Sequence, residues 1–406
     1  MLSDDLVKLN EPSFYHGAPH VVYEIMRREA PVYWYDTGGF WAITRYDDIK
    51  HISKETDLFS TESGTLITDV LSGLNAVETM YPDGVENFFT SDPPRHAQLR
   101  SLLSFAFSRR RVLGMQRQIE QLVKTYLDRI EVGCEIEFVS KVSIPLPIEV
   151  IQIFMDLEDM PIDDAYHWSE AVFKMGSHLS EAEYKEIGAS LQGMVEYFDT
   201  IVEARRKEPK DDFIGRLVES EVDNKKINNM MVEMYCQTIL VGGNETTRNG
   251  ISATVKLFSD HPDQFQRLLD DETLIDSAVE EVLRYHNPVH GFMRTAKCDT
   301  EIQGTKIAEG EHVYMLYGAG NRDPEVFPDP DAFDIGRFRK PFPMHVTFGF
   351  AEHVCIGSAL ARLEMRTLLK ELRARFSRIE VVAKPERPQS LLGNGFVTMP
   401  TRFTAH

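Results

Sequence analysis

The stretch FGFAEHVCIG, Phe348 to Gly357, decides how this chain of 406 residues is interpreted. It places glycines and aromatic residues around Cys355, and the run SALARLEMRTLLKEL that follows favours a helix. A cysteine just before a helix lies where backbone N–H groups and the positive end of the helix dipole stabilise a thiolate. Such a thiolate is suited to binding a metal. A lone cysteine is more often a small buried apolar residue, so the rest of the sequence must decide between these readings.

The other cysteines and the net charge exclude several classes of protein. Cys134, Cys236 and Cys298 lie far from Cys355 and from one another, and no CxxC or CxxCH pair occurs. This pattern argues against a zinc site, a disulfide framework and covalently attached heme. Lys and Arg total 44 against 64 Asp and Glu, which gives a formal net charge of −20. Nucleic acid is therefore not expected as a partner, because phosphate binding requires a positive surface.

The sequence predicts a cytoplasmic protein without a membrane anchor. The opening segment, Met1 to Phe14, carries charged residues and lacks the apolar stretch of a signal peptide. The most apolar later stretch, Val142 to Met155, contains Pro145, Pro147 and Glu149 and is too short to span a bilayer.

The pattern along the chain predicts one mainly α domain, residues 1–406, with a minor β region. VYWYD and FWAITRY, joined by a Thr37-Gly38-Gly39 turn, are typical of a β-hairpin. The segment from Thr61 to Thr90 is too long for an inert connection, which makes it a candidate binding loop. The expected portions are β-rich at about 32–46, 288–322 and 379–403, and helical at about 93–287 and 356–376.

Two polar motifs stand on predicted helices. In SAVEEVLRYHNP, Glu281 and Arg284 are three residues apart and share one helical face. Such a pair is often only a solvent-exposed ion pair that contributes little to stability. In DPPRHAQLR, His96 and Arg100 are four apart and also share a face. A solvated basic face is the alternative for the second pair.

A third motif, LVGGNETTRN, lies inside a long helical segment. Glycine within a helix costs about 1 kcal/mol relative to alanine, so Gly242 and Gly243 indicate that something large approaches the backbone there. Glu245 and Thr246 follow directly as an acid and an alcohol. In isolation this pair is also consistent with helix capping or solvation, an interpretation that the adjacent glycines disfavour.

Together these motifs resemble the cytochrome P450 family of heme-thiolate monooxygenases. Phe348, Gly349, His353, Cys355 and Gly357 stand at the spacing of its heme-binding loop, and the motifs follow in the family's order from Asp92 to Gly357. The resemblance implies an α-rich triangular prism with small β-sheets and a noncovalent heme b. The sequence departs from the family pattern at Ala351, where the family prefers glycine. A left-handed backbone conformation at an alanine would cost about 1 kcal/mol.

The resemblance also assigns roles to individual residues. Cys355 becomes the iron ligand, within a loop that includes Phe348 and Gly357. The heme propionates are assigned to His96, Arg100, Arg294 and His353, the proton relay to Glu245 and Thr246, and a buried structural network to Glu281, Arg284 and Arg337.

The implied activity is hydroxylation of an apolar small molecule, such as a terpenoid, a steroid or a fatty chain, with O2. A peroxide-driven peroxygenase and a non-catalytic heme or lipid carrier are the alternatives, and neither requires the acid–alcohol pair. The candidate substrate contacts are apolar residues, namely Leu66, Ile67, Val70, Leu71, Leu74, Phe173, Met175, Ile239, Gly243, Val289, Phe292, Leu392 and Phe396.

The electron donor is expected to be a separate two-iron ferredoxin, reduced by a flavoprotein reductase, and the protein is expected to be a monomer. Cations that could steer an acidic donor gather at Arg109, Arg110 and Arg111 and at Arg362 and Arg366. The alternative is that these arginines pair with neighbours such as Glu364 and Glu371.

Overall fold

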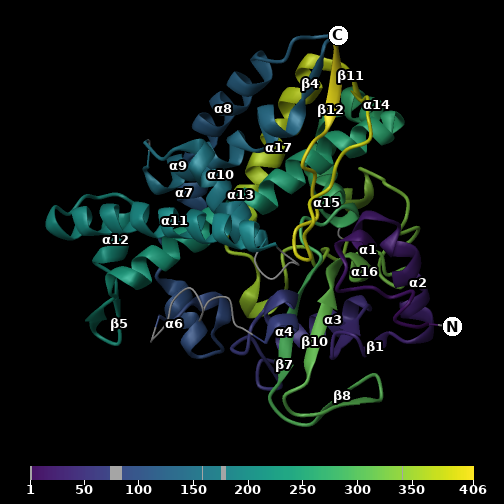
Figure 1. Cartoon of the computed structure of the whole chain (residues 1–406). Coiled ribbons are helices and arrows are strands. Elements are labelled where there is room, and N and C mark those ends of the chain that lie inside the picture. The colour runs from purple at the N-terminus through teal and green to yellow at the C-terminus, as the bar shows by residue number, and fades with distance from the viewer. Residues whose placement is uncertain (1, 74–84, 158, 175–179, 341) are drawn as a thin grey trace.

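A computed structural model of the chain describes residues 2–73, 85–157, 159–174, 180–340 and 342–406. Helices make up most of the molecule, and the strands β1, β7 and β10 gather on the side that carries the N-terminus (Figure 1). The mainly α fold with a minor β region is therefore confirmed. Among the described residues, none of the helices combines the length and apolar character that crossing a membrane requires.

The helices are bounded as follows: α1 Pro12–His16, α2 Pro19–Glu29, α3 Tyr46–Lys54, α4 Ile67–Ser72, α6 Arg95–Ser101, α7 Arg109–Gly114, α8 Gln116–Asp128, α9 Pro145–Met155, α10 Ile162–Lys174, α11 Glu181–Lys207, α12 Phe213–Val218, α13 Asn229–Asp260, α14 Pro262–Asp270, α15 Ile275–Tyr285, α16 Tyr317–Gly320 and α17 Ser358–Arg375. Short helical turns are η1 Phe88–Thr90, η2 Val139–Ser143, η3 Glu272–Leu274, η4 Arg337–Arg339 and η5 Ala351–His353.

The strands are β1 Val32–Tyr35, β2 Phe40–Ile43, β3 Phe59–Ser60, β4 Glu135–Glu137, β5 Glu221–Val222, β6 Lys225–Lys226, β7 Gly291–Ala296, β8 Thr300–Ile302, β9 Thr305–Ile307, β10 His312–Leu316, β11 Phe376–Val381 and β12 Pro400–Ala405. The main sheet has the order β1-β2-β10-β7-β3, and a second sheet has the order β11-β12-β4.

The predicted front hairpin is confirmed. β1 and β2 pair antiparallel, with Val32 opposite Ile43 and Tyr35 opposite Phe40. Far along the chain, β10 adds to β2 in parallel and β7 adds to β10 antiparallel. The front of the chain and the segment 288–322 therefore build one sheet, which the sequence pattern alone did not predict.

The expected loop from Thr61 to Thr90 is partly helical, because it contains α4 and η1. The Asp69 carboxylate accepts hydrogen bonds from the N–H groups of Thr65 and Leu66, at 3.1 and 3.0 Å. These bonds satisfy donors at the helix start that would otherwise be unpaired. The helical turn escaped prediction because it is too short to show a 3.6-residue period.

The centre of the molecule is α13, a helix of 32 residues that contacts helices α9, α10, α11, α12, α14, α15 and α17. Its start is capped by Asn228, whose side chain accepts from the Met231 N–H at 2.8 Å. Helices α9, α10, α11 and α17 pack around it, and most of its side chains are buried. A helix buried on nearly all sides gives polar residues within it few sources of solvation, so each polar group on α13 needs a specific partner.

Candidate functional site

The turn that carries Cys355 is closed by its own backbone. The Cys355 N–H donates to the Phe348 carbonyl at 2.7 Å, and α17 begins three residues after the cysteine. Two residues of the turn have left-handed backbone, Gly349 with φ 74° and Ala351 with φ 57°. Ala351 therefore adopts the conformation that glycine favours, at a cost of about 1 kcal/mol.

The Cys355 side chain is exposed to a pocket of about 600 Å³. Protein atoms surround its other sides, and this burial raises the pKa of the thiol. The N–H groups of Gly357 and Ser358 and the guanidinium groups of Arg100 and Arg362 act in the opposite direction but do not outweigh it. In the protein alone, the N–H groups at the start of α17 therefore stabilise the Cys355 thiolate less than burial destabilises it. A bound metal cation would reverse the balance, because it deprotonates a coordinating thiol outright.

The pocket beside Cys355 is lined by His96, Ala97, Arg100, Ser101, Ser104, Phe107, Glu352, Cys355 and Ile356. Residues from α6 and from the cysteine turn therefore face one space, although some 250 residues separate them in the sequence. Arg100 holds the two parts together, since its Nη2 donates to the Val354 carbonyl at 2.6 Å.

Two histidines and a buried arginine lie together near this pocket. The rings of His96 and His353 are 4.2 Å apart between centroids. Both ring nitrogens of His96 and the Nε2 of His353 are buried without a hydrogen-bond partner among the described residues. Burial lowers the pKa of His96 and brings that of His353 to about 3, so both rings are neutral at pH 7. Arg294 is also buried, and its Nη1 donates to the Met293 carbonyl at 2.7 Å.

These groups have no anionic partner of their own. No described carboxylate lies within ion-pair distance of Arg100 or Arg294. Buried polar groups in folded proteins are nearly always hydrogen-bonded. The four predicted propionate residues thus form a cluster of donors with capacity to bind an anionic group.

On α13, Gly242 and Gly243 have different surroundings. A Cβ atom at Gly242 would have no neighbour within 4 Å, whereas one at Gly243 would collide with the Ile151 side chain of α9. The expectation that both glycines admit a large group is therefore corrected for Gly243, which allows the close approach of α9. The Thr246 hydroxyl donates to the Gly242 carbonyl at 2.7 Å, on the open side of the helix.

Glu245 is buried with a cation beside it. Its Oε1 forms an ion pair with Arg248, one turn further along α13, and its Oε2 has no partner among the described residues. Burial raises the pKa of the Glu245 carboxyl, although the Arg248 guanidinium opposes this. Sequence reasoning missed Arg248, although its i, i+3 spacing from Glu245 is the same signal that identified Glu281 and Arg284.

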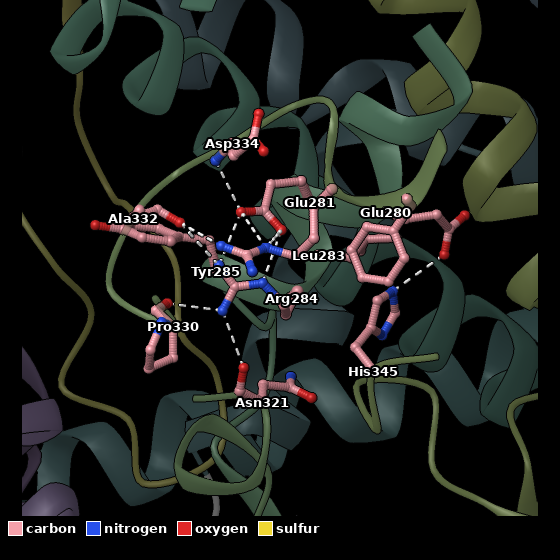
Figure 2. A network of polar contacts seen from close by, with 12 residues as sticks. Glu280, Glu281, Leu283, Arg284, Tyr285, Asn321, Pro330, Ala332, Asp334 and His345 are labelled. Carbon is pink, nitrogen blue, oxygen red and sulfur yellow. Dashed lines mark hydrogen bonds and ion pairs between the residues drawn. The ribbon is translucent and has the colours of Figure 1, made fainter. Parts of the chain in front are cut away.

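Glu281, Arg284 and Arg337 form a dense polar network, and Figure 2 shows Glu281 and Arg284 at its centre. Arg284 donates to both Glu281 oxygens, at 2.7 and 2.8 Å, and the Arg337 Nε lies 3.1 Å from Oε2. The Asp334 N–H donates to Glu281 Oε1 at 2.9 Å. Arg284 also donates to the carbonyls of Asn321, Pro330 and Ala332. The network therefore ties α15 to the segment that leads into the cysteine turn.

Beside this network lies a second one that sequence reasoning missed. Glu280 accepts from Arg362 Nε at 2.6 Å and from His345 Nε2 at 3.1 Å. Burial raises the pKa of Glu280, but these hydrogen bonds outweigh it and lower the pKa to about 2. Burial lowers the pKa of His345, so this ring is neutral at pH 7 and Arg362 is the charged partner. Arg362 also lies 4.4 Å from the centre of the Phe348 ring, which links α15 to the turn.

The candidate substrate contacts fall into several parts of the molecule. Phe173 on α10 and Glu245 on α13 both approach Gly393 in the tail, and Val289 pairs with Gly393. Ile67, Val70 and Leu71 pack into the apolar cluster under the N-terminal helices, and Phe396 stacks on His286. The remaining described candidates are partly or fully buried, namely Leu66, Ile239, Gly243, Phe292 and Leu392, while Leu74 and Met175 lie outside the described residues.

The predicted arginine surface is partly neutralised. Arg362 pairs with Glu280 and Arg366 with Asp276, both acidic partners being on α15. Glu364 and Glu371 were the expected alternative partners, but neither pairs with these two arginines. Arg109 and Arg110 are exposed and form no ion pair with any carboxylate in the described part of the chain.

Comparison with known proteins agrees with this arrangement. The family model for cytochrome P450 matches residues 147–405. The linalool 8-monooxygenase of Pseudomonas putida is 34% identical over 95% of this chain and 96% of its own. A steroid C26-monooxygenase of Mycolicibacterium smegmatis is 31% identical over 100% of this chain and 98% of its own.

Solved structures agree as well. CYP108D1 from Novosphingobium aromaticivorans has a TM-score of 0.86 and 27% identity, with 100% of both chains covered. Cytochrome P450 CYP109Q5 from Chondromyces apiculatus has a TM-score of 0.85 and 30% identity over 98% of both chains. The chain belongs to the cytochrome P450 family of heme-thiolate monooxygenases.

Proposed function

We propose that this protein hydroxylates an apolar terpenoid, steroid or alkyl-chain substrate with O2, and that Cys355 is the ligand to the heme iron. The observation that carries the proposal is the exposure of the Cys355 sulfur to a pocket, beside buried cationic and imidazole groups that lack anionic partners. The thiolate-ligated heme of the family, when bound, supplies the cleavage of O2 and the oxidation of carbon.

The residues near Cys355 fit a heme. An anionic cofactor with two carboxylates would satisfy the unpartnered nitrogens of His96 and His353 and the charges of Arg100 and Arg294. The exposed backbone at Gly242 allows a flat group to approach α13. Arg100 serves both parts of the site, because it also donates to the carbonyl of Val354, next to the ligand.

Thr246 and Glu245 are proposed to handle protons. The Thr246 hydroxyl donates its hydrogen bond to the Gly242 carbonyl. The lone pairs of its oxygen therefore remain free to accept a hydrogen bond on the open side of the helix. Glu245 is buried, which raises the pKa of its carboxyl and so favours its protonated form. A carboxyl that holds a proton inside the site can act as a proton donor.

An apolar substrate is supported by the side chains near Glu245 and by the relatives. Phe173 and Val289 are buried and lie beside Gly393 in the tail, which Glu245 also approaches. Relatives carry the names linalool 8-monooxygenase, steroid C26-monooxygenase and methyl-branched lipid omega-hydroxylase. These names share a largely hydrocarbon substrate, which an apolar pocket binds by removing its surface from water.

Electrons are proposed to come from a separate ferredoxin that docks near α7. Arg109 and Arg110 are exposed and unpaired within the described structure, and they stand out on a chain of net charge −20. A local positive surface accelerates the association of an acidic partner, and salt weakens this effect.

The test begins with the ligand. The reduced protein with carbon monoxide should show the strongly red-shifted Soret band of thiolate ligation, and Cys355→Ala should lose it. Cys298→Ala, at another exposed cysteine, is the matched control. Persistence of the band in Cys355→Ala would overturn the ligand assignment.

The reaction type is tested by turnover. With reductant, ferredoxin and O2, Thr246→Ala should retain heme and substrate binding but divert electrons to peroxide. Efficient turnover with hydrogen peroxide, together with unchanged coupling in Thr246→Ala, would instead favour a peroxygenase. A panel of terpenes, steroids and fatty acids, screened for a change in heme spin state, identifies the substrate class.

A further inference from the structure

A second pocket, of about 490 Å³, opens beside the last turns of α13 and shares no lining residue with the pocket at Cys355. Its walls come from α13, from the segment that follows β11 and from the tail. They combine three cations, Lys256, Lys384 and Arg387, with apolar side chains that include Phe396. Sites for small molecules in proteins have volumes of about 300–1,000 Å³, so this pocket is large enough to hold one.

The cations of this pocket outnumber the acids that could neutralise them. Asp260 is the carboxylate in the wall, and it accepts from Lys256 Nζ at 2.6 Å. Lys384 and Arg387 form no ion pair with any carboxylate in the part of the chain that the structure describes. Glu386 stands between them in the sequence but does not line the pocket. The wall therefore carries local positive charge on a chain whose formal net charge is −20.

Arg387 is the cation that the fold holds in place. Its guanidinium lies 5.0 Å from the centre of the Phe396 ring, and its Nη1 donates to Asn394 Oδ1 at 3.0 Å. Burial lowers the pKa of this guanidinium, and no described carboxylate opposes the effect. Arginine nevertheless stays charged in proteins, and a partly buried charge is unfavourable without an opposite charge. An anion in the pocket would supply that charge, since the arginine fork binds a carboxylate through two parallel hydrogen bonds.

His286 lies behind Phe396 and is subject to the same positive charge. The two rings are stacked, with 5.6 Å between their centroids. Burial lowers the pKa of His286 to about 3, and the charges of Arg387 and Lys256 act in the same direction. The ring is therefore neutral at pH 7, and the positive charge of this region resides on the lysine and arginine side chains.

The rest of the wall indicates what else the ligand carries. Val381, Val382 and Pro385 are partly buried, and Phe396 is buried. A compact, fully hydrated anion would leave these apolar side chains in contact with water. A carboxylate with a hydrocarbon body would cover them, which removes apolar surface from water.

Asn394 connects this pocket to the other side of the tail. Its side chain accepts from Arg387, and the next residue along the chain is Gly393. Gly393 lies so close to Phe173 that a Cβ atom there would be 3.3 Å from the ring, and it pairs with Val289. Phe173 and Val289 are candidate substrate contacts. A ligand that holds Arg387 therefore also holds the tail against the substrate side of the molecule.

We propose that the pocket beside Arg387 is a second binding site, for a small carboxylate with a hydrocarbon body, and that its occupancy strengthens binding on the substrate side through Asn394 and Gly393. The coupling rests on the proposed function, because it takes Phe173 and Val289 as substrate contacts. The carboxylate is bound and released unchanged. Coupling between two sites is reciprocal, so a ligand on the substrate side strengthens binding of the carboxylate by the same factor.

The site is tested by isothermal titration calorimetry of the heme-containing protein with 2-naphthoate at pH 7. Arg387→Gln should weaken binding by roughly tenfold or more, because it removes hydrogen bonds between charged groups. Lys384→Gln, at an exposed position where folding is not at stake, should weaken binding by less. Arg378→Gln is the matched control, because Arg378 is 64% exposed on β11, pairs with Glu380 and lies outside the pocket. 2-Naphthamide has the same rings without the charge and should not bind.

The coupling is tested with 4-phenylimidazole, a neutral apolar compound that binds ferric heme and is titrated by its optical spectrum. Saturating 2-naphthoate should lower its dissociation constant by about fivefold, the lower end of typical coupling between sites. Asn394→Ala should abolish this change while 2-naphthoate still binds, because it removes the group that joins Arg387 to Gly393. A rise in the dissociation constant would mean that both compounds compete on the substrate side, which would overturn the second site.

The remaining outcomes distinguish the parts of the proposal. Equal affinity of 2-naphthoate for the unchanged protein and for Arg387→Gln and Lys384→Gln would overturn the site. Displacement of 2-naphthoate by equimolar inorganic phosphate would overturn the requirement for a hydrocarbon body. A dissociation constant of 4-phenylimidazole that 2-naphthoate leaves unchanged would overturn the coupling. A protein that binds no heme would refute the proposed function, while calorimetry with 2-naphthoate would still decide whether the site exists.

Discussion

Replacing Glu281 by alanine should remove a large part of the stability of the folded protein. Glu281 is fully buried, and its carboxylate accepts from Arg284, from Arg337 and from the N–H of Asp334. Glu281→Ala leaves Arg284, which is also fully buried, without a carboxylate partner. The remaining partners of Arg284 are the carbonyls of Asn321, Pro330 and Ala332, which bind the guanidinium but do not neutralise it.

The magnitude follows from these contacts. Removal of one member of a buried ion pair costs about 3–5 kcal/mol. The orphaned Asp334 N–H adds about 1–3 kcal/mol if water does not reach it. Folded domains are stable by only about 5–15 kcal/mol, so we expect Glu281→Ala to be poorly folded and to retain little heme.

The assay is urea unfolding followed by circular dichroism, together with heme content per protein. Asp276→Ala is the matched control, because Asp276 is on the same helix and pairs with Arg366 at 2.5 Å but is 75% exposed. Exposed pairs contribute about 0–1 kcal/mol. If Glu281→Ala unfolds within about 1 kcal/mol of Asp276→Ala, the reasoning about the buried charge is refuted.

Three further predictions follow from other parts of the structure. Ala351→Gly should raise the free energy of unfolding by up to about 1 kcal/mol, because it relieves the left-handed backbone at φ 57°; an equal or lower urea midpoint would contradict this. Glu280 has its pKa lowered from 4.5 to about 2, so it contributes stability above its ordinary pKa that is lost as pH falls from about 4.5 toward about 2. Glu280→Gln should flatten this part of a plot of urea midpoint against pH, and an unchanged slope would exclude Glu280 as its source. Charge reversal at Arg109 and Arg110 should slow reduction by ferredoxin more than reversal at Arg366, whose charge Asp276 already offsets; equal rates in all variants, insensitive to salt, would move the docking site elsewhere.

Local patterns allowed much of the fold to be predicted. The front hairpin follows from alternation and a Gly-containing turn, and the long helix α13 follows from its period, because both depend on neighbours in the sequence. The left-handed conformation at Ala351 was not predicted from a local pattern; the resemblance indicated only that glycine is preferred at this position, and the structure keeps the left-handed backbone with alanine. The parallel pairing of β10 with β2 was also not predicted, since it joins segments about 270 residues apart.

The candidate site divides in the same way. The sequence by itself identified the candidates for chemistry, because Cys355, Glu245 and Thr246 stand within short motifs whose spacing is fixed along the chain. Tertiary structure alone decided which side chains surround these motifs. Ile151 fills the space beside Gly243, Glu280 neutralises Arg362, and α10 covers the face that carries Arg248. The physical reason is that burial and charge pairing depend on partners from distant segments, and these meet only when the helices pack.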